Sequence, residues 1–493
     1  MQQGTLMQFF HWYYPEGQLW KQVIRESGRL SELGITAVWL PPAYKGSNGS
    51  HSVGYDTYDL YDLGEFDQKG STVTRYGSRR DYIRAVQALH DHGIQVYADI
   101  VLNHKAGADE AEDIHVRKMN PDKRNEAISE PYVIRAYTKF TFPGRQGKYS
   151  GFIWDQQCFT GIDWDEQHQE KGIFKIMNEY GEDWAEVIET EKGNYDYLMY
   201  ADIEFRNPAV REELKRWGGW YLENTGVDGF RLDALKHISP AFYVEWLDHL
   251  RQHTGSELFT VGEFWQPDNR DVLMEYMHAT GQRMHLFDAP LHRNFHEASR
   301  TGKDYDLRNI FSGTLLEADP EHAVTLVDNH DTQPLQALES PVEAWFKPLA
   351  YALILLREKG YPCIFYPDLY GAEYDDKGKD GGTHHIVLEP CAHLEKMLDI
   401  RKTIARGGQR DYFDHPNLLG WTREGVKEDA ASGCAVLISG GDGGEKEMEL
   451  GAAHAGKTFS ELTGSREEKV TLDENGKGVF FVNGGSIAIW GAA

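Results

Sequence analysis

The amino-acid sequence predicts an α/β protein: a (β/α)8 TIM barrel with a domain inserted after strand three and an antiparallel β domain at the C-terminus. Three observations favour this fold class. Strand-like apolar runs alternate with helical stripes up to about residue 104, and again from about residue 207. Between these stretches the alternation stops. From about residue 410, short alternating runs are separated by glycine-rich turns.

The first elements show the alternation most clearly. Residues 5–10 are rich in strand formers, and residues 19–33 have apolar side chains at helical spacing, with Gly34 as the expected end of the helix. Residues 35–40 form a continuous apolar run that a proline pair closes, as expected of a strand buried on both faces. A second helical stripe at 82–89 leads into the next strand. This β-α-β-α-β pattern predicts a parallel sheet.

Counting such runs along the chain gives eight strands, the number at which parallel βα units close into a barrel. The predicted strands are 5–10, 35–40, 94–100, 227–233, 258–263, 284–288, 324–328 and 362–367. Further helices are expected at 209–224 and 241–253. We therefore divide the chain into a barrel (1–104 and 207–409), an inserted domain (105–206) and a C-terminal β domain (410–493).

Composition excludes several classes of protein. Asp and Glu number 78 against 51 Lys and Arg, a formal charge of −27, so we expect no nucleic-acid partner and no binding to an anionic membrane. No apolar run is long enough for a membrane helix, and the first residues already read as a strand and lack a secretory leader. The four cysteines are widely spaced, which favours free thiols. We expect a cytoplasmic protein that is a monomer.

Carboxylates follow three of the predicted strands, at the barrel end where this architecture keeps its chemistry. In the segment GFRLDALKH (229–237), Arg231 and Asp233 lie two residues apart on a strand and share a face. A neighbouring guanidinium favours the ionised carboxylate. An ionised, poorly solvated carboxylate suits a nucleophile or a group that stabilises a cation.

Glu263 has the opposite surroundings in the segment FTVGEFW (259–265). Apolar neighbours without a local cation are expected to raise its pKa, as a general acid near neutral pH requires. Two carboxylates with contrasting pKa values form the acid and nucleophile pair of glycoside hydrolysis. In the third segment, VDNHDTQ (327–333), Asp331 and His330 are expected to hold a sugar ring.

The alternative for each carboxylate alone is a helix cap or a structural ion pair. Three of them at the ends of strands four, five and seven are explained better by catalysis. The local sequence does not separate a retaining from an inverting reaction, because that depends on the spacing of the carboxylates in space.

At these residues the sequence resembles glycoside hydrolase family thirteen, the α-amylase family, over essentially the whole chain. The four motifs that carry the resemblance are DIVLNH (99–104), GFRLDALKH (229–237), VGEFW (261–265) and VDNHD (327–331), in order along the chain. The inserted segment resembles the family's B domain and the β-rich end its C domain. Other segments, among them FPGR (142–145), resemble the liquefying and the cytoplasmic bacterial members of the family.

The resemblance implies a role for each site residue. Asp233 is expected to be the nucleophile, Glu263 the acid and base, and Asp331 the third carboxylate, which binds sugar hydroxyls. The expected substrate contacts are Tyr55, His104, Arg231, Lys236, His237 and His330. The implied reaction is retaining endo-hydrolysis of α-1,4 bonds in starch, glycogen and maltodextrins.

A hard cation is the expected cofactor. Asn103 closes strand three, and Asp196 and Asp202 lie six residues apart late in the inserted segment. Oxygen donors without a cysteine cluster suit Ca²⁺. The resemblance adds the backbone carbonyl of His237 and implies one structural calcium ion between barrel and B domain.

The chain departs from its secreted liquefying relatives around this site. Where those have further aspartates, this sequence has Thr160, Ala185 and Arg206. Because Arg206 brings a positive charge, we expect one calcium ion here and not a cluster.

Two rival functions stay open at this point. Another activity of the same family, such as α-glucosidase, maltooligosaccharide-forming amylase or transglycosylase, would use the same nucleophile and acid. A non-catalytic barrel, such as a glycan-binding or transporter-accessory protein, would require that the carboxylates were lost, which they are not.

Overall fold

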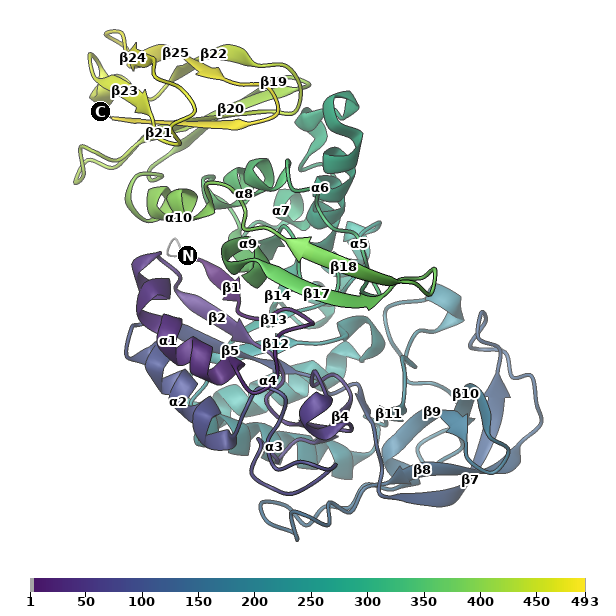
Figure 1. The fold of residues 1–493 in the computed structure, drawn as a ribbon. Helices are drawn as coiled ribbons and strands as arrows, with labels where there is room; N and C mark the ends of the chain where they lie inside the picture. Colours follow the sequence, from purple (N-terminus) through teal and green to yellow (C-terminus); the bar gives the residue numbers. More distant parts are fainter. Residues whose placement is uncertain (1–3, 493) are drawn as a thin grey trace.

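The computed structural model describes residues 4–492. Eight parallel strands close into a barrel in the order β1-β16-β15-β14-β13-β12-β5-β2, which confirms the predicted fold class (Figure 1). The strands are β1 (Leu6–Gln8), β2 (Ala37–Leu40), β5 (Gln95–Ile100), β12 (Gly229–Leu232), β13 (Phe259–Gly262), β14 (His285–Phe287), β15 (Ala323–Leu326) and β16 (Tyr361–Phe365). All eight predicted strands are present, and each is a little shorter than predicted or shifted by a residue or two.

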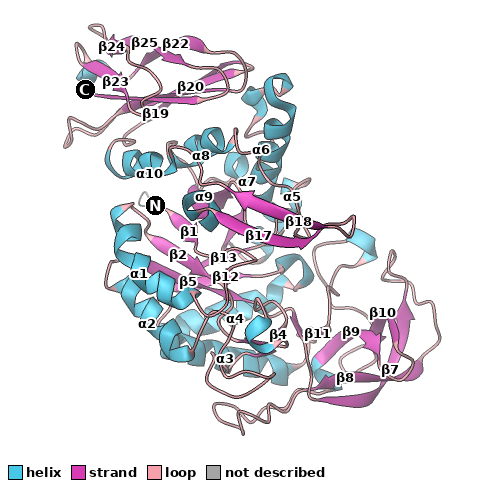
Figure 2. Cartoon of the chain, in the orientation of Figure 1, coloured by secondary structure: helices cyan, strands magenta, loops and turns pink. Residues whose placement is uncertain are grey.

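The barrel strands are apolar because both of their faces are buried. Every residue of β2, β12 and β16 is buried, and helices cover the outside of the barrel (Figure 2). The parallel register pairs Arg231 of β12 with Asp99 of β5 on one side and with Val261 of β13 on the other. The strand register alone therefore places Arg231 and Asp99, a pair of opposite charges, side by side inside the barrel.

Helices follow the strands, and those predicted at 19–33, 82–89, 209–224 and 241–253 are confirmed as α1 to α4, whereas the later helices were not predicted individually. The longer ones are α1 (Leu19–Glu32), α2 (Arg79–His90), α3 (Pro208–Thr225), α4 (Pro240–Thr254), α5 (Arg270–Ala279), α6 (Ala289–Thr301), α8 (Lys347–Leu355) and α10 (Leu394–Thr403); α7 (Leu315–Ala318) and α9 (Tyr366–Tyr370) are short. The helix α3 shows why they start and stop where they do. Asn207 caps its N-terminus, with Pro208 at the first turn, and Gly226 ends it in the left-handed conformation.

The segment inserted between β5 and α3 forms a sheet of its own beside the barrel (Figure 1). Its strand order is β6-β11-β9-β10-β7-β8, all antiparallel. The strands are β6 (His104–Lys105), β7 (Glu110–Met119), β8 (Tyr132–Lys139), β9 (Phe159–Asp165), β10 (Glu170–Ile176) and β11 (Ala201–Ile203). Because β6 already begins at His104, this sheet starts one residue before the predicted border, and the domain borders stay predictions.

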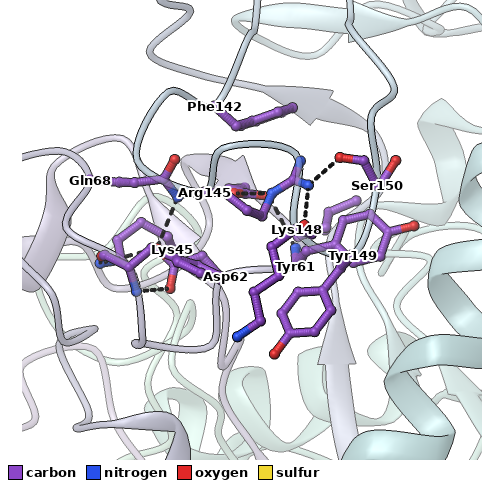
Figure 3. A network of polar contacts seen from close by, with 12 residues as sticks. Lys45, Tyr61, Asp62, Gln68, Phe142, Arg145, Lys148, Tyr149 and Ser150 are labelled. Atoms are coloured by element: carbon purple, nitrogen blue, oxygen red, sulfur yellow. Dashed lines mark hydrogen bonds and ion pairs between the residues drawn. The ribbon is translucent and has the colours of Figure 1, made fainter.

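A buried ion pair joins this segment to the barrel loop that carries β3 (Lys45–Gly46) and β4 (Thr57–Asp59), and a second buried ion pair lies within that loop (Figure 3). Arg145 of the inserted segment donates from Nε to Asp59 Oδ2 at 3.0 Å, and Lys45 Nζ lies 3.3 Å from Asp62 Oδ2. Gln68 Nε2 donates to both carboxylates, at 2.9 and 3.0 Å. We call these five residues the interface network.

Among the elements that were not predicted, the most prominent is a β-hairpin. After β16 the chain forms a hairpin of β17 (Ala372–Lys377) and β18 (Thr383–Leu388), which extends along the barrel (Figure 1). Its strands are polar and largely exposed, so they lack the apolar alternation on which the prediction depended. Tyr374 is its main anchor: the ring stacks on Tyr13 at 3.9 Å, and its hydroxyl donates to Pro334 O.

The C-terminal region is antiparallel β structure, as predicted. One sheet has the order β19-β20-β21-β26-β23-β24, and β22 pairs with β25. The strands are β19 (Gln409–His415), β20 (Leu418–Arg423), β21 (Cys434–Ser439), β22 (Gly444–Glu449), β23 (Thr458–Glu461), β24 (Lys469–Thr471), β25 (Lys477–Val482) and β26 (Ile487–Ala492). The four cysteines are free thiols. Within residues 4–492, none of the helices has the length and apolarity that crossing a bilayer requires.

Candidate active site

A cleft of about 1030 Å³ opens at the C-terminal ends of the barrel strands. Asp233, Glu263 and Asp331 line it together. Four of the predicted substrate contacts also line it: Tyr55, His104, Lys236 and His237. The two remaining ones, Arg231 and His330, lie behind its wall, where each contacts a lining carboxylate. Residues that are far apart in sequence thus converge on one cavity.

Arg231 is the centre of the polar contacts in the cleft. Its guanidinium is fully buried and donates from Nη1 to Asp99 Oδ1 at 2.9 Å and to Asp233 Oδ1 at 2.6 Å. Its Nη2 donates to Glu263 Oε2 at 3.2 Å. One guanidinium therefore aligns three carboxylates, and a buried cation of this kind favours the ionised form of its nearest partners.

Glu263 lies at the end of β13, and its Oε2 also accepts a hydrogen bond from Ala234 N at 3.0 Å. Burial, together with the negative charges of Asp233 and Asp331, raises the pKa of Glu263 to about 8 although Arg231 opposes the shift. The expectation of no local cation was wrong: the guanidinium comes from the neighbouring strand, which local sequence does not reveal. The predicted direction of the shift nevertheless agrees, because burial outweighs the cation.

Asp331 follows β15 in a tight turn. Asn329 Oδ1 accepts from the backbone N–H groups of Asp331 and Thr332, both at 2.9 Å. Burial raises the pKa of Asp331 to about 7, and the charge of Asp233 adds to the shift. His330 Nε2 lies 3.3 Å from Asp331 Oδ2, and burial lowers the pKa of His330 well below its usual value. The ring is therefore neutral near pH 7.

Tyr55 and His104 form the wall beside Asp233. The Tyr55 hydroxyl donates to Asp99 Oδ2 at 2.7 Å, and its ring stacks on His330 at 5.0 Å. His104 Nε2 lies 2.8 Å from the backbone carbonyl of Tyr55. Burial lowers the pKa of His104, which keeps its ring neutral.

The residues that the sequence analysis missed include Asp99, which is buried behind the cleft, and Trp12, which lines it. Asp99 is the first residue of the motif DIVLNH, but no role was given to it; its partner Arg231 lies on the next strand of the barrel. Trp12 lines the cleft and stacks on Tyr55, with ring centroids 5.7 Å apart. The only feature of the sequence that could have indicated Trp12 is its position directly after the first strand, where the loops of a TIM barrel carry site residues.

The inserted segment supplies the opposite wall through Tyr195. His237 Nδ1 lies 2.6 Å from the backbone carbonyl of Tyr195, and Lys236 Nζ lies 4.7 Å from the centre of the Tyr195 ring. Lys236 also lies 3.8 Å from Glu191 Oε2. The predicted residues Lys236 and His237 thus connect the barrel to the inserted segment.

The predicted metal donors come together under this contact. Asn103 Nδ2 donates to Asp202 Oδ1 at 3.1 Å, whereas Asn103 Oδ1 is buried without a hydrogen-bond partner in the described residues. Burial raises the pKa of Asp196 to about 7 and that of Asp202 well above its usual value, and the Asp196 charge adds to the second shift. Two buried carboxylates and an orphaned amide oxygen fit a hard cation such as Ca²⁺.

The residues around these donors limit how many cations fit. Thr160 donates its hydroxyl to Asp202 Oδ2, and Ala185 N donates to Asp196 Oδ2 at 3.0 Å. Arg206 pairs with Glu204 through two hydrogen bonds, Nε to Oε1 at 2.7 Å and Nη2 to Oε2 at 2.6 Å. Between residues 4 and 492 there is no group of three or more His, Cys, Asp or Glu side chains arranged for a metal.

A closed barrel whose strand ends place acidic side chains around a large open cleft suits the hydrolysis of glycosidic bonds. The family model of the α-amylase catalytic domain matches residues 20–415. The chain belongs to the α-amylase family of glycoside hydrolases.

Individual relatives agree with this assignment. The cytoplasmic α-amylase of Escherichia coli is 52% identical over 492 residues, 99% of each chain. An α-amylase of Geobacillus stearothermophilus is 50% identical over 99% of this chain and 86% of its own. The solved structure of the α-amylase of Geobacillus thermoleovorans in complex with acarbose superposes with a TM-score of 0.64 at 16% identity. That match covers 100% of this chain and 98% of the other, and supports the fold.

Proposed function

We propose that this chain hydrolyses internal α-1,4 bonds of starch, glycogen and maltodextrins with retention of configuration. The observation that carries the proposal is the arrangement around Arg231, which brings Asp233 and Glu263 into contact with one guanidinium at the rim of the cleft. A retaining glycosidase needs two carboxyl groups close together, one ionised and one protonated. The raised pKa of Glu263, about 8, supplies the protonated one near neutral pH.

The reaction then has two steps. Glu263 protonates the glycosidic oxygen while an Asp233 oxygen attacks the anomeric carbon, so the bond to the leaving chain breaks and a glycosyl ester forms. Glu263, now ionised, takes a proton from water, which attacks the same carbon and releases Asp233. Asp331 holds sugar hydroxyls and stabilises the positive charge that develops on the ring.

Substitution of the two carboxylates tests these roles. We expect Asp233→Asn and Glu263→Gln each to lower kcat on soluble starch by at least about 10⁴-fold, because both act in the bond-breaking step. A maltosyl fluoride needs no proton on its leaving group, so it should restore the first step in Glu263→Gln but not in Asp233→Asn. Unchanged circular dichroism and thermal unfolding are the control. If either variant keeps a tenth of the activity, the assignment is wrong.

The mode of attack needs a separate measurement. We expect a maltoheptaose blocked at its non-reducing end to be cleaved, because an endo-acting enzyme does not need a free end. Proton NMR during this reaction should show the α anomer of each new reducing end first. A product released first as the β anomer would indicate inversion. If the blocked maltoheptaose were not cleaved, the result would favour an exo-acting α-glucosidase.

We also propose one structural calcium ion, held by Asn103, Asp196, Asp202 and the backbone carbonyl of His237. Its chemistry would be electrostatic: it would neutralise the two buried carboxylates and join the barrel to the inserted segment. At free calcium near 100 times the Kd, such an ion contributes about 2.7 kcal/mol to stability. Chelation should therefore lower the Tm.

Elemental analysis together with thermal unfolding at varied free calcium tests this metal. We expect one calcium per chain, a response that Asp202→Asn abolishes, and no change in the matched surface variant Asp268→Asn. Two or more tightly held ions, or a Tm that is independent of calcium, would contradict the proposal.

The cytoplasmic location and the monomeric state belong to the same proposal. The relative from Escherichia coli supports the first, and size-exclusion chromatography with light scattering tests the second.

A further inference from the structure

We propose that Gln8, at the end of β1, sets the tautomer of His330 and so turns the Nε2–H of that ring toward Asp331 and the bound sugar. Gln8 would then be a positioning residue for the reaction, acting through His330. The inference rests on the proposed function for its catalytic consequence, whereas the tautomer itself is a property of the resting protein.

The geometry starts with a fixed glutamine. Gln8 is fully buried, and its backbone lies between two neighbouring barrel strands, paired with Phe365 of β16 and Trp39 of β2. Its Nε2 lies 3.0 Å from His330 Nδ1. The side chain therefore reaches from the first strand of the barrel to the loop after the seventh.

The ring nitrogens of His330 have few other polar partners. Aromatic rings surround it: Tyr55 and Trp12 stack in parallel at 5.0 and 6.1 Å, with Phe10 at 5.2 Å. Across the described part of the chain, its polar contacts are Gln8 at Nδ1 and Asp331 at Nε2, the latter at 3.3 Å. Each ring nitrogen thus faces one partner.

Two arguments place the ring proton. Above the pKa of Asp331, about 7, its carboxylate only accepts, so Nε2, which lies 3.3 Å from Asp331 Oδ2, carries the proton. Nδ1 then accepts from the Gln8 amide. On the other side, Gln8 Oε1 is buried with no hydrogen-bond partner among residues 4–492. Turning the amide over would orphan its NH₂ group instead, and a buried N–H without a partner is rarer and less favourable than a buried carbonyl without one.

The ring must also be neutral for a tautomer to matter. Burial and the nearby Arg231 charge hold the pKa of His330 well below its usual value, so the imidazole carries one proton at neutral pH. That proton has two possible positions, and the Gln8 N–H excludes one of them. The result is a directed chain of bonds from β1 through His330 to Asp331, which presents a donor at the cleft.

NMR of the protein with ¹⁵N-labelled histidine tests the tautomer directly, with the His330 signals assigned by their loss in His330→Asn. We expect Nδ1 to be unprotonated and Nε2 to carry the proton at neutral pH in the wild type. Gln8→Met, apolar and of similar length, should introduce the other tautomer. The matched control is Met7→Leu on the same strand, which should leave the His330 signals unchanged. A proton on Nδ1 in the wild type, or no change in Gln8→Met, would overturn the inference.

Kinetics separate positioning from simple packing. Because Gln8→Met leaves a buried ring nitrogen without its donor, we expect kcat/KM on maltoheptaose to fall about 10- to 100-fold, with folding intact. In the His330→Asn background the same substitution should change kcat/KM by less than about twofold, because the residue through which it acts is gone. An equal loss in both backgrounds would show that Gln8 only supports the fold.

The two proposals fail in different ways. If the wild type did not cleave α-1,4 glucans, the proposed function would fall, while the NMR result would still stand on its own. An active wild type with the opposite tautomer would overturn only the role of Gln8.

Discussion

The catalytic cleft and the interface network are both built from buried charges, but the balance of charge differs between them. In the cleft, Asp99, Asp233 and Glu263 share the single guanidinium of Arg231, and Asp331 adds a fourth carboxyl group nearby. In the interface network each carboxylate has its own cation: Arg145 pairs with Asp59, and Lys45 with Asp62. Gln68 Nε2 donates to the same two oxygens, Asp59 Oδ2 and Asp62 Oδ2, and backbone N–H groups satisfy the other oxygen of each carboxylate.

This difference has a chemical consequence. Carboxyl groups that outnumber their cation cannot all be ionised in a buried site, so protons are retained. The pKa of Glu263 rises to about 8 and that of Asp99 to about 6, chiefly through burial. One-to-one pairs leave no such surplus, although burial also raises the pKa of Asp59, and the Arg145–Asp59 pair connects the inserted segment to the barrel loop. The carboxyl groups of the cleft can therefore keep and transfer a proton, whereas the interface network has a structural role.

Removing the shared cation should have the largest effect. We expect Arg231→Met to lower kcat on soluble starch by about 10³-fold, because Asp233 and Glu263 both lose the guanidinium that holds them in place. We expect the folded protein to persist. Activity assays with calorimetry measure both quantities.

Arg231→Lys sharpens this prediction. It keeps the charge but loses the planar fork that contacts three carboxylates, so its activity should lie between those of the wild type and Arg231→Met. Arg231→Met could instead unfold part of the protein while the molecules that stay folded keep full specific activity. In that case Arg231 would have the same structural role as the cations of the interface network.

The interface network should show the opposite response. Arg145→Ala leaves Asp59 buried without its cation, so we expect the free energy of unfolding to fall by about 3–5 kcal/mol. The kcat of the folded enzyme should stay within about twofold of the wild type. Chemical denaturation and starch assays give the two numbers.

An exposed ion pair provides the matched control. Arg293 lies 2.8 Å from Asp268, but both side chains are exposed, so Arg293→Ala should change stability by less than about 1 kcal/mol. Equal losses in Arg145→Ala and Arg293→Ala would show that burial is not what makes the network strong.

The sequence predicted the barrel well because its strands are short apolar runs with helices between them, and local periodicity is enough to find such elements. It missed the β17–β18 hairpin because residues such as Asp375 and His385 give that hairpin no apolar face. Its exposed strands carry no signal that distinguishes them from a polar loop.

The candidate site divides in the same way. Asp233 and Glu263 could be found because each directly follows a recognisable strand, and Asp331 because it lies in the loop after β15. Asp99 and Gln8 could not, since their roles depend on a partner that strand register brings close: Arg231 for Asp99, and His330 for Gln8. Local sequence also gave Glu263 no cation, although Arg231 lies 3.2 Å away. Contacts across a barrel are set by its closure, which a single stretch of sequence does not contain.

The pH dependence of the wild type is the most direct measure of the surplus charge. Because the acid must be protonated before the first step, kcat/KM should fall about tenfold for each pH unit above the pKa of Glu263, about 8. The sign follows from the raised pKa: the proton is present below that pH and lost above it. A pH profile of kcat/KM on maltoheptaose from pH 6 to 10 measures this limb.

Glu263→Gln is the control for the same limb, because an amide does not titrate. Its residual kcat/KM should be flat over the pH range in which the wild type declines. If both enzymes lost activity in parallel, the limb would report unfolding or another group. If kcat/KM of the wild type did not change with pH, burial and the neighbouring carboxylates would not hold a proton on Glu263. The surplus of carboxyl groups would then not distinguish the cleft from the interface network.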